Sequence, residues 1–276
     1  MPGHEDLSPA AGGPAPAAAD FDEVFLAAAA SPGIRRVWEL AEPELPPQIE
    51  PLSFVSPGLL RHVAQSLGLS PGHTLVDLGC GGGGPGLWLA READVSLVGV
   101  DFSAAAVGQA THRAALFGLA GRAQFVVGDL TNSGLPPASA DAAVSFDAFH
   151  FAADPAAAAG EARRVLRPGR RLVLTNWQPK DPGDARLPGR MRIDWPPVLR
   201  SAGFTGITME AKPEWHDLFT RIYRVALGLG DPGDDTLLAT LQQEARQRLP
   251  MTELIYRVAI TATAPDQPPD HEVRLE

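Results

Sequence analysis

The sequence predicts an α/β protein whose core is a doubly wound, mostly parallel β-sheet. Between residues 74 and 177, apolar strand-like segments alternate with segments of helical periodicity. Such alternation is typical of strands joined by right-handed helical crossovers in one parallel sheet. The first strand-like segment runs directly into residues 79–86, six of which are glycine. A glycine-rich turn between a strand and a helix lets a ligand approach the main chain and exposes N–H groups at the helix start.

The composition is that of a globular protein and argues against several classes of partner. Of the 276 residues, 45% are hydrophobic and 20% are charged, as in ordinary soluble domains. The formal net charge of −10 provides no attraction for nucleic acid or for an anionic membrane surface. No segment reaches the ~18 apolar residues of a membrane helix, so we expect a cytoplasmic protein. Only two of the 23 basic residues are lysines, which, beside abundant alanine, glycine and proline, is typical of a GC-rich bacterial coding sequence.

The chain before the glycine-rich turn is expected to form a tail and a helical cap. Residues 1–19 are rich in proline, glycine and alanine without periodicity, which is typical of a disordered tail. Residues 20–72 are expected to form the cap. Within it, the spacing of apolar residues predicts three helices, over 21–30, 34–40 and 56–67.

The sheet domain is expected over residues 73–264, with a polar tail over 265–276. A helical segment at about 214–250, interrupted by a glycine-rich stretch, is interpreted as an insertion into that domain. The remaining predicted helices are 85–92, 103–118, 154–166 and 192–202. The predicted strands are 74–79, 95–101, 123–128, 141–147, 170–177, 204–211 and a last one at about 252–263.

Three aspartates fall in or after the first three strands and indicate the kind of ligand. The glycine turn alone also fits the dinucleotide fingerprint, so a nicotinamide cofactor is an alternative. Asp77 lies inside the first strand, where a carboxylate could orient the loop and meet a cationic amino group. Asp101 ends the second strand and could accept hydrogen bonds from ribose hydroxyls, or serve only as a helix cap. Asp129 follows the third strand, where it could accept from an adenine amino group.

As an ordered set, these motifs resemble the class I S-adenosylmethionine-dependent methyltransferases. The set is completed by Asp141–Phe151 and by the stretch from Glu161 to Gly169, and the resemblance covers roughly residues 53–211. It is strongest for small-molecule enzymes of ubiquinone biosynthesis and natural-product tailoring. The resemblance implies a Rossmann-like sheet of seven strands whose last strand, here 252–263, runs antiparallel.

The resemblance also implies which residues hold S-adenosylmethionine and its product S-adenosylhomocysteine. The methionine portion would lie on the glycine loop, the ribose on Asp101 and the adenine beside Phe102. Phe146 would line the wall near the sulfonium. The residues expected to bind the cofactor are Asp77, Gly79, Cys80, Gly81, Gly83, Asp101, Phe102, Asp129, Leu130 and Phe146.

Methyl transfer from a sulfonium requires mainly positioning, and a general base when the acceptor is a hydroxyl or a carbon acid. His150, after the fourth strand, is the first candidate base, with a pocket-shaping role as the alternative. His216 lies in the insertion, which similar enzymes use as a lid. No His/Asp/Glu cluster has the spacing of metal ligands, so metal-independent chemistry is expected. Residues expected at an apolar or aromatic acceptor, unless they only pack the cap on the sheet, are Trp38, Phe54, His150, Asn176, Trp177, Trp215, Phe219 and Tyr223.

The sequence thus predicts methyl transfer to a small apolar or aromatic metabolite, with oxygen slightly favoured over carbon or nitrogen. Bacterial secondary metabolism, including antibiotic biosynthesis, is the expected setting. Two alternatives stay open: an enzyme that binds the cofactor but catalyses a non-methylating step such as cyclisation, and a non-catalytic partner protein.

Overall fold

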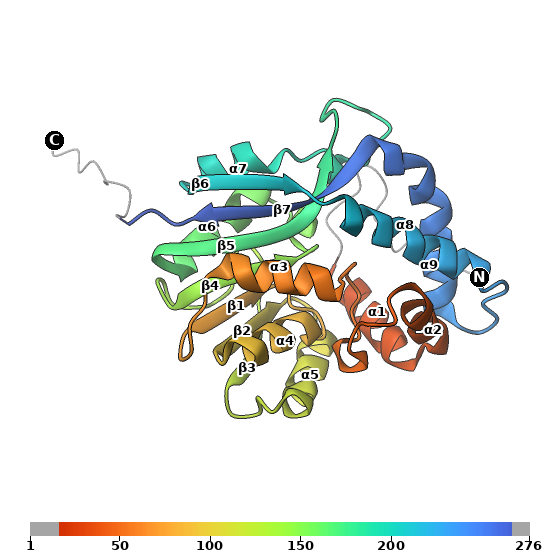
Figure 1. Ribbon diagram of the computed structural model, residues 1–276, viewed down its shortest axis with the longest axis horizontal. Coiled ribbons are helices and arrows are strands. Elements are labelled where there is room, and N and C mark those ends of the chain that lie inside the picture. Colours follow the sequence, from red (N-terminus) through yellow and green to blue (C-terminus); the bar gives the residue numbers. More distant parts are fainter. Residues whose placement is uncertain (1–16, 267–276) are drawn as a thin grey trace.

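The structure is a computed structural model that describes residues 17–266 (Figure 1). The tails predicted over 1–19 and 265–276 therefore fall almost wholly outside the described residues. At the boundary, helix α1 (Ala18–Ala30) already begins at Ala18, and the side chain of Asp20 accepts a hydrogen bond from the Ala17 N–H at 2.9 Å. The first predicted helix is thus present and starts three residues earlier than its apolar spacing indicated.

One seven-stranded sheet forms the centre of the molecule, in the order β3-β2-β1-β4-β5-β7-β6. The pairs among β1 to β5 are parallel, whereas β7 runs antiparallel to both β5 and β6. This confirms the predicted fold class, including the antiparallel last strand. The strands are β1 (Thr74–Leu78), β2 (Ser96–Asp101), β3 (Ala123–Val127), β4 (Ala140–Phe146), β5 (Leu166–Pro179), β6 (Thr205–Ala211) and β7 (Ile255–Thr263).

Helices cover both faces of this sheet, as right-handed crossovers require. Helices α3 (Pro57–Leu67), α4 (Gly84–Ala93) and α5 (Ala104–Arg113) lie on one face, where α3 and α4 bury their leucines against β1 and β4. On the other face, α6 (Pro155–Val165) buries alanines and α7 (Trp195–Ser201) buries Trp195 and Leu199. The α3 segment, expected to be part of a cap, packs instead on the sheet because Leu59, Leu60 and Val63 give it an apolar stripe.

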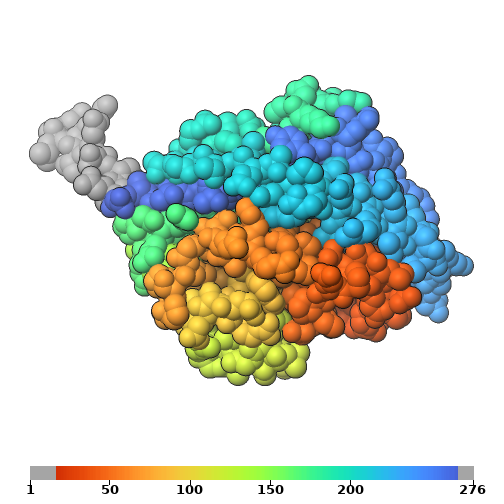
Figure 2. Space-filling view, in the orientation of Figure 1, coloured from red at the N-terminus to blue at the C-terminus, as the bar shows by residue number. Residues whose placement is uncertain are grey.

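Four helices form what we call the helical cover, at the end of the sheet where β1 to β4 terminate (Figures 1 and 2). They are α1, α2 (Pro32–Ala41), α8 (Pro213–Gly228) and α9 (Thr236–Arg248). Val37 of α2 packs with Leu218 and Ile222 of α8 in one apolar cluster. The side chain of Asp235 accepts hydrogen bonds from Ser31 Oγ at 2.8 Å and from the Gly33 N–H at 2.8 Å. Segments from the two ends of the chain therefore build one cover.

The element boundaries differ from the predicted ones mainly at β5, which starts at Leu166 instead of residue 170. Pairing with β7 also extends it to Pro179, opposite Ile255. The helix predicted over 103–118 is divided into α5 and a 3-10 turn.

Within residues 17–266, none of the helices combines the length and the apolar character of a bilayer span. The 3-10 turns are η1 (Pro47–Ile49), η2 (Ala114–Phe117), η3 (Phe149–Phe151), η4 (Gly189–Met191) and η5 (Leu249–Leu254).

A buried ion pair joins β4, β5 and β7 below the helical cover. Asp147 follows β4 with a φ of 55° and is 6% exposed, and Arg257 of β7 is fully buried. Arg257 Nη1 lies 2.8 Å from Asp147 Oδ1, and Nη2 donates to Oδ2 at 3.0 Å. The same carboxylate accepts hydrogen bonds from Thr175 Oγ1 at 2.9 Å and from the Phe54 N–H at 3.1 Å. One charge pair thus ties three strands to the segment before α3.

Asp147→Asn is expected to lower the free energy of unfolding by about 3–5 kcal/mol, because it leaves the Arg257 guanidinium buried without its counter-charge. Asparagine retains the left-handed conformation that this position needs. The matched control is Glu39→Ala, which removes an exposed pair with Arg36 and should cost less than about 1 kcal/mol. Urea denaturation followed by circular dichroism measures both. Equal losses in the two variants would contradict a structural role for the buried pair.

Candidate functional site

The glycine loop connects β1 to α4 and is held against the neighbouring strand. The Gly79 and Cys80 N–H groups both donate to the Val100 carbonyl, at 2.8 and 3.0 Å. Gly79 has a φ of 73°, and a Cβ at this position would lie 2.4 Å from the Ala148 Cβ. A side chain is excluded there on both grounds, which keeps the main chain bare at the start of the loop that leads to α4.

Asp77 is a buried carboxylate that lacks a hydrogen-bond partner. It is 1% exposed, and neither of its side-chain oxygens has a partner within the described part of the chain. Gly86 of α4 packs directly against it, since a Cβ on Gly86 would lie 2.4 Å from Asp77 Oδ2. Burial, and then the charge of Asp101, raise the pKa of Asp77 to about 8. A buried carboxylate of this kind gains most from a cationic ligand group.

Asp101 connects the glycine loop to the start of α5. Its Oδ2 accepts from the Gly81 N–H at 2.8 Å and its Oδ1 from the Ser103 N–H at 3.0 Å. Burial raises the pKa of Asp101, and these main-chain hydrogen bonds oppose the rise. Each carboxylate oxygen accepts at more than one position, so ribose hydroxyls and the loop can share the same group. The Asp129 carboxylate also accepts hydrogen bonds from its own turn, from the Thr131 N–H at 2.7 Å and from the Thr131 Oγ1 hydroxyl at 2.6 Å.

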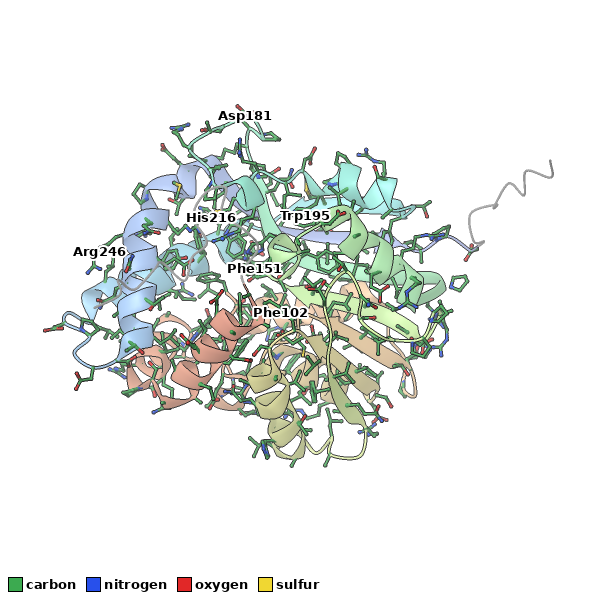
Figure 3. All side chains as sticks on the ribbon, turned by 180° about the vertical axis from the view of Figure 1, so that it is seen from behind. Phe102, Phe151, Asp181, Trp195, His216 and Arg246 are labelled. Carbon is green, nitrogen blue, oxygen red and sulfur yellow. The ribbon has the colours of Figure 1, made fainter. Side chains whose placement is uncertain are left out.

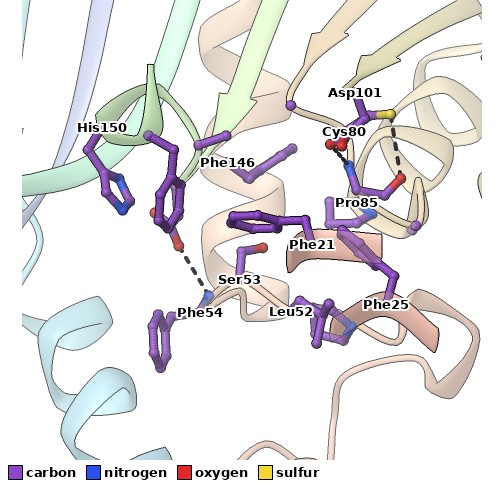
Figure 4. Close-up of a pocket in the computed structure, with 18 of the residues that line it drawn as sticks. Phe21, Phe25, Leu52, Ser53, Phe54, Cys80, Pro85, Asp101, Phe146 and His150 are labelled. Carbon is purple, nitrogen blue, oxygen red and sulfur yellow. Dashed lines mark hydrogen bonds between the residues drawn. The ribbon is translucent and has the colours of Figure 1, made fainter. Parts of the chain in front are cut away.

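A cavity of about 290 Å³ joins the glycine loop to an aromatic region beneath the helical cover (Figure 4). All ten residues expected at the cofactor line it, as do six of the eight expected at the acceptor. The aromatic rings of this region meet edge to face: Phe54 lies 5.6 Å from Trp177, 4.9 Å from Phe219 and 5.5 Å from Tyr223 between ring centroids. The predicted residues in this wall are Trp38, Phe54, His150, Trp177, Phe219 and Tyr223.

Three predicted residues lie outside the cavity wall. Asn176 of β5 does not line the cavity, although its side chain reaches His150 and raises the pKa of that residue against the effect of burial; its Oδ1 accepts from the Trp177 N–H at 2.8 Å. Trp215 is buried in the main core and packs edge to face on His62 at 5.5 Å. His216 (Figure 3) lies 5.9 Å from Phe219 between ring centroids and is not among the residues that line the cavity. None of the three meets the space that a ligand could fill.

His150 lies in the cavity wall on turn η3, with its ring 5.3 Å from Trp177 and 4.1 Å from Phe151. It is 8% exposed, and its Nδ1 has no hydrogen-bond partner within the described range. Burial holds the pKa of His150 well below its ordinary value, and Arg190, Arg248 and Arg257 lower it further. The imidazole is therefore neutral at physiological pH and can accept a proton.

In contrast to His150, which is a candidate proton acceptor, the thiol of Cys80 keeps its own proton. Its thiol is buried in the loop, and burial raises its pKa well above the ordinary value. Because a nucleophilic or metal-binding cysteine needs the thiolate, Cys80 serves here as a small residue of the loop. Among the described residues there is no group of histidines, cysteines and carboxylates that could hold a metal ion.

Helix α1 covers the cavity beside the glycine loop, a contact that the sequence did not indicate. The Phe21 ring lies 5.1 Å from Phe102 and 5.3 Å from Phe151, between the loop and the aromatic region (Figure 4). Asp22 fastens the helix by accepting from Ser103 Oγ at 2.5 Å and from the Ala105 N–H at 2.9 Å. In the sequence, the phenylalanines of α1 are the feature that could have indicated this contact. Other unpredicted residues of the wall include Phe25, Asp147, Arg190, Glu244 and Arg248.

Comparison with known proteins explains why these features occur together. Residues 76–174 match the family model described as a methyltransferase domain. Residues 76–174 therefore form a methyltransferase domain, which supports the resemblance to the class I S-adenosylmethionine-dependent methyltransferases. The expected cofactor residues that fall in the matched segment include Asp77, Asp101 and Asp129.

The chain is similar to proteins of several kinds. It is 32% identical over 117 residues to a sterol 24-C-methyltransferase of Neurospora crassa, covering 42% of this chain and 31% of the relative. It is 34% identical over 116 residues to the 27-O-demethylrifamycin SV methyltransferase of Amycolatopsis mediterranei, covering 42% and 43%. The crystal structure of the cyclase SpnF superimposes with a TM-score of 0.65 and 26% identity, over 76% of this chain and 81% of the other. The matched segment spans less than half the length of either sequence relative.

The affinity for S-adenosylhomocysteine should rise with pH between about pH 6 and 7.5, by up to about tenfold per unit. The pKa of Asp77 is about 8 in the free protein, so the carboxyl is protonated below that pH. Binding a cationic amino group favours the carboxylate and so releases the proton.

Calorimetric titration at several pH values measures this dependence. Asp77→Asn should bind more weakly with little pH dependence, whereas the exposed control Asp181→Asn should behave as wild type. A wild-type affinity that stays constant over this pH range would contradict the role given to Asp77.

Proposed function

We propose that this protein transfers the methyl group of S-adenosylmethionine to a small-molecule acceptor bound in the aromatic region. The observation that carries the proposal is the single cavity, which has an unpartnered buried carboxylate and a bare glycine loop at one end and an aromatic wall at the other. The amino group of the cofactor fits Asp77, its ribose fits Asp101, and its adenine fits the space between Phe102 and Leu130. The sulfur then faces Phe146 and the aromatic region.

An apolar or aromatic acceptor fits this wall best. Phe54, Trp177, Phe219 and Tyr223 present ring faces and edges to the cavity, and aromatic rings bind one another in such edge-to-face arrangements. Bacterial natural-product chemistry is the setting we favour, because one of the relatives acts at an oxygen of a rifamycin according to its name. We favour oxygen as the acceptor atom for the same reason and because His150 can take its proton.

The cofactor supplies an electrophilic methyl group that is already activated by its sulfonium. What the chain contributes is alignment and the exclusion of water. Helix α1 closes the cavity beside the glycine loop, and the ring cluster of Phe54 fixes the plane of the acceptor. Neutral His150 would accept the proton of an acceptor hydroxyl as the oxygen bonds to the methyl carbon and the carbon–sulfur bond breaks with its electron pair left on sulfur, and the imidazolium would later return the proton to solvent.

The proposal is tested by incubating the purified protein with S-adenosylmethionine and a panel of hydroxylated aromatic and polyketide-like acceptors. Release of S-adenosylhomocysteine together with a product heavier by one methylene unit is the expected result. Tight binding of NAD without binding of S-adenosylmethionine would contradict it.

Cyclisation is a second candidate, supported by the likeness to the cyclase SpnF over most of both chains. In a cyclase of this fold, the aromatic wall would fold a flexible substrate while the cofactor stays unreacted. The same incubation distinguishes the two, because an isomer of unchanged mass without release of S-adenosylhomocysteine favours cyclisation.

His150→Ala should lower turnover about 10²–10⁴-fold while the affinity for S-adenosylhomocysteine is unchanged, if His150 accepts the acceptor proton. The pKa of His150 lies well below the ordinary 6.5. The base therefore stays deprotonated, and the wild-type rate at saturating S-adenosylmethionine should be level from neutral pH down through 6.5 and fall only in more acidic solution. The control is His216→Ala, which alters a residue outside the cavity wall and should retain most of the activity. A loss of less than about tenfold for His150→Ala would assign this residue to positioning alone.

A further inference from the structure

A second cavity, of about 220 Å³, adjoins the cavity between the glycine loop and the aromatic region, which we call the main cavity. The proposed reaction does not use it. Helices α1 and α2 form one side of the second cavity, and the segment from Pro43 to Leu52 contributes four prolines and two leucines to its wall. A concave, mostly apolar space beside a reaction site can take part of a substrate.

The two cavities share part of their wall. Phe25 and Leu52 (Figure 4) line both cavities, and so does Trp38 of α2. Trp38 packs against the apolar cluster of the helical cover, which Phe54 of the aromatic region also contacts. It packs as well against the main core cluster that contains Leu45 of the second cavity. The Trp38 side chain therefore lies between the aromatic region and the second cavity.

The polar side chains in the wall of the second cavity already have partners within the protein. Arg221 Nη2 lies 2.8 Å from Glu42 Oε2, and Glu50 pairs with Arg113. Arg113 also donates to the Gly82 carbonyl at 2.8 Å. None of the buried polar atoms that lack a partner in residues 17–266 belongs to this wall. A charged ligand group would lose its hydration here without gaining a partner. The other polar side chains of the wall, each of which makes a hydrogen bond, are Arg35, Glu39 and Gln109.

The walls of the second cavity are held in place by contacts with the sheet domain. Ile49 is fully buried in the main core, and a Cβ on Gly84 would overlap the Ile49 carbonyl oxygen, so the proline-rich segment packs directly on the start of α4. On the other side, Gln109 Nε2 donates to the Phe25 carbonyl at 2.8 Å and fastens α1 to α5. A ligand therefore meets a space that is formed in advance, which lowers the cost of binding.

We propose that the acceptor is an elongated molecule whose reacting ring lies in the aromatic region and whose uncharged, apolar extension passes Trp38 into the second cavity. This inference rests on the proposed function, since it names the class of acceptor for the same site. The main cavity, of about 290 Å³, takes the cofactor as well, so the adjoining space is where a longer acceptor extends. An alkyl or isoprenoid chain has the chemistry that this wall accepts.

Probes that share one ring and differ in their extension test this proposal. With saturating S-adenosylhomocysteine, calorimetry measures the dissociation constants of phenol, 4-butylphenol, 4-hexylphenol and 6-(4-hydroxyphenyl)hexanoate, whose chain ends in a carboxylate. The affinity should rise about fourfold for each methylene group that becomes buried. The hexanoate should bind at least about tenfold more weakly than 4-hexylphenol, because its charge would leave water for an apolar wall.

Variants of α1 locate the chain. Ala28 lines the second cavity but does not line the main cavity, so Ala28→Phe fills the second cavity alone. It should remove at least about tenfold of the affinity that the hexyl chain adds, with the affinities for phenol and for S-adenosylhomocysteine unchanged. The matched control is Ala30→Phe, at an exposed position of the same helix that lines neither cavity, and it should retain the full gain. If Ala28→Phe does not fold, Ala29→Phe reaches the same cavity and should have the same effect.

Three outcomes would overturn the inference: phenol and 4-hexylphenol binding within about twofold of each other in the wild type, equal effects of Ala28→Phe and Ala30→Phe on the gain from the chain, or a hexanoate that binds as tightly as 4-hexylphenol. Failure of the proposed function is seen separately, because S-adenosylhomocysteine would then not bind. Retained cofactor binding and methyl transfer without a gain from the chain would count against the inference alone.

Discussion

The buried pair between Asp147 and Arg257 is the interaction on which the site depends. It lies where β4 ends and β7 is inserted between β5 and β6, and it also holds the Phe54 main chain. The guanidinium of Arg257 stacks on Trp177 at 4.3 Å, so the same charge pair supports the aromatic floor of the cavity. A buried pair of this kind contributes little net stability over an apolar substitute. Its value here is that it fixes the relative positions of strand ends and aromatic rings.

From that centre the cavity divides into two chemically different ends. The cofactor end is acidic and built by parallel strands, with Asp77, Asp101 and Asp129 in or after β1, β2 and β3. The acceptor end is aromatic, with arginines brought by η4 and α9. A cofactor with an amino group and a sulfonium suits the acidic end, whereas an apolar or aromatic acceptor suits the other.

The parts of the site that the sequence predicted are those determined locally. A strand followed by a glycine turn places Asp77, Gly79 and Asp101 at one sheet edge whatever the rest of the chain does. The residues that it missed depend on contacts between distant segments: Phe21 reaches the site because Asp22 binds the start of α5, and Arg248 because α9 packs on α2 through Asp235. Asn176 and Trp177 were both expected at the acceptor, and only Trp177 lines the cavity. Trp215 was expected at the acceptor but is buried in the main core, because α8 packs this side of the helix against the sheet. The periodicity of a helix does not indicate where on the sheet the helix packs.

The most direct test of the account is a crystal structure with S-adenosylhomocysteine bound. We expect the amino group of the ligand within about 3 Å of an Asp77 oxygen, its ribose on Asp101, and its sulfur facing Phe146 and the space beside His150. Adenine bound among Phe54, Trp177 and Phe219 instead, or a ligand that leaves Asp77 without a partner, would contradict the division of the cavity into a cofactor end and an acceptor end.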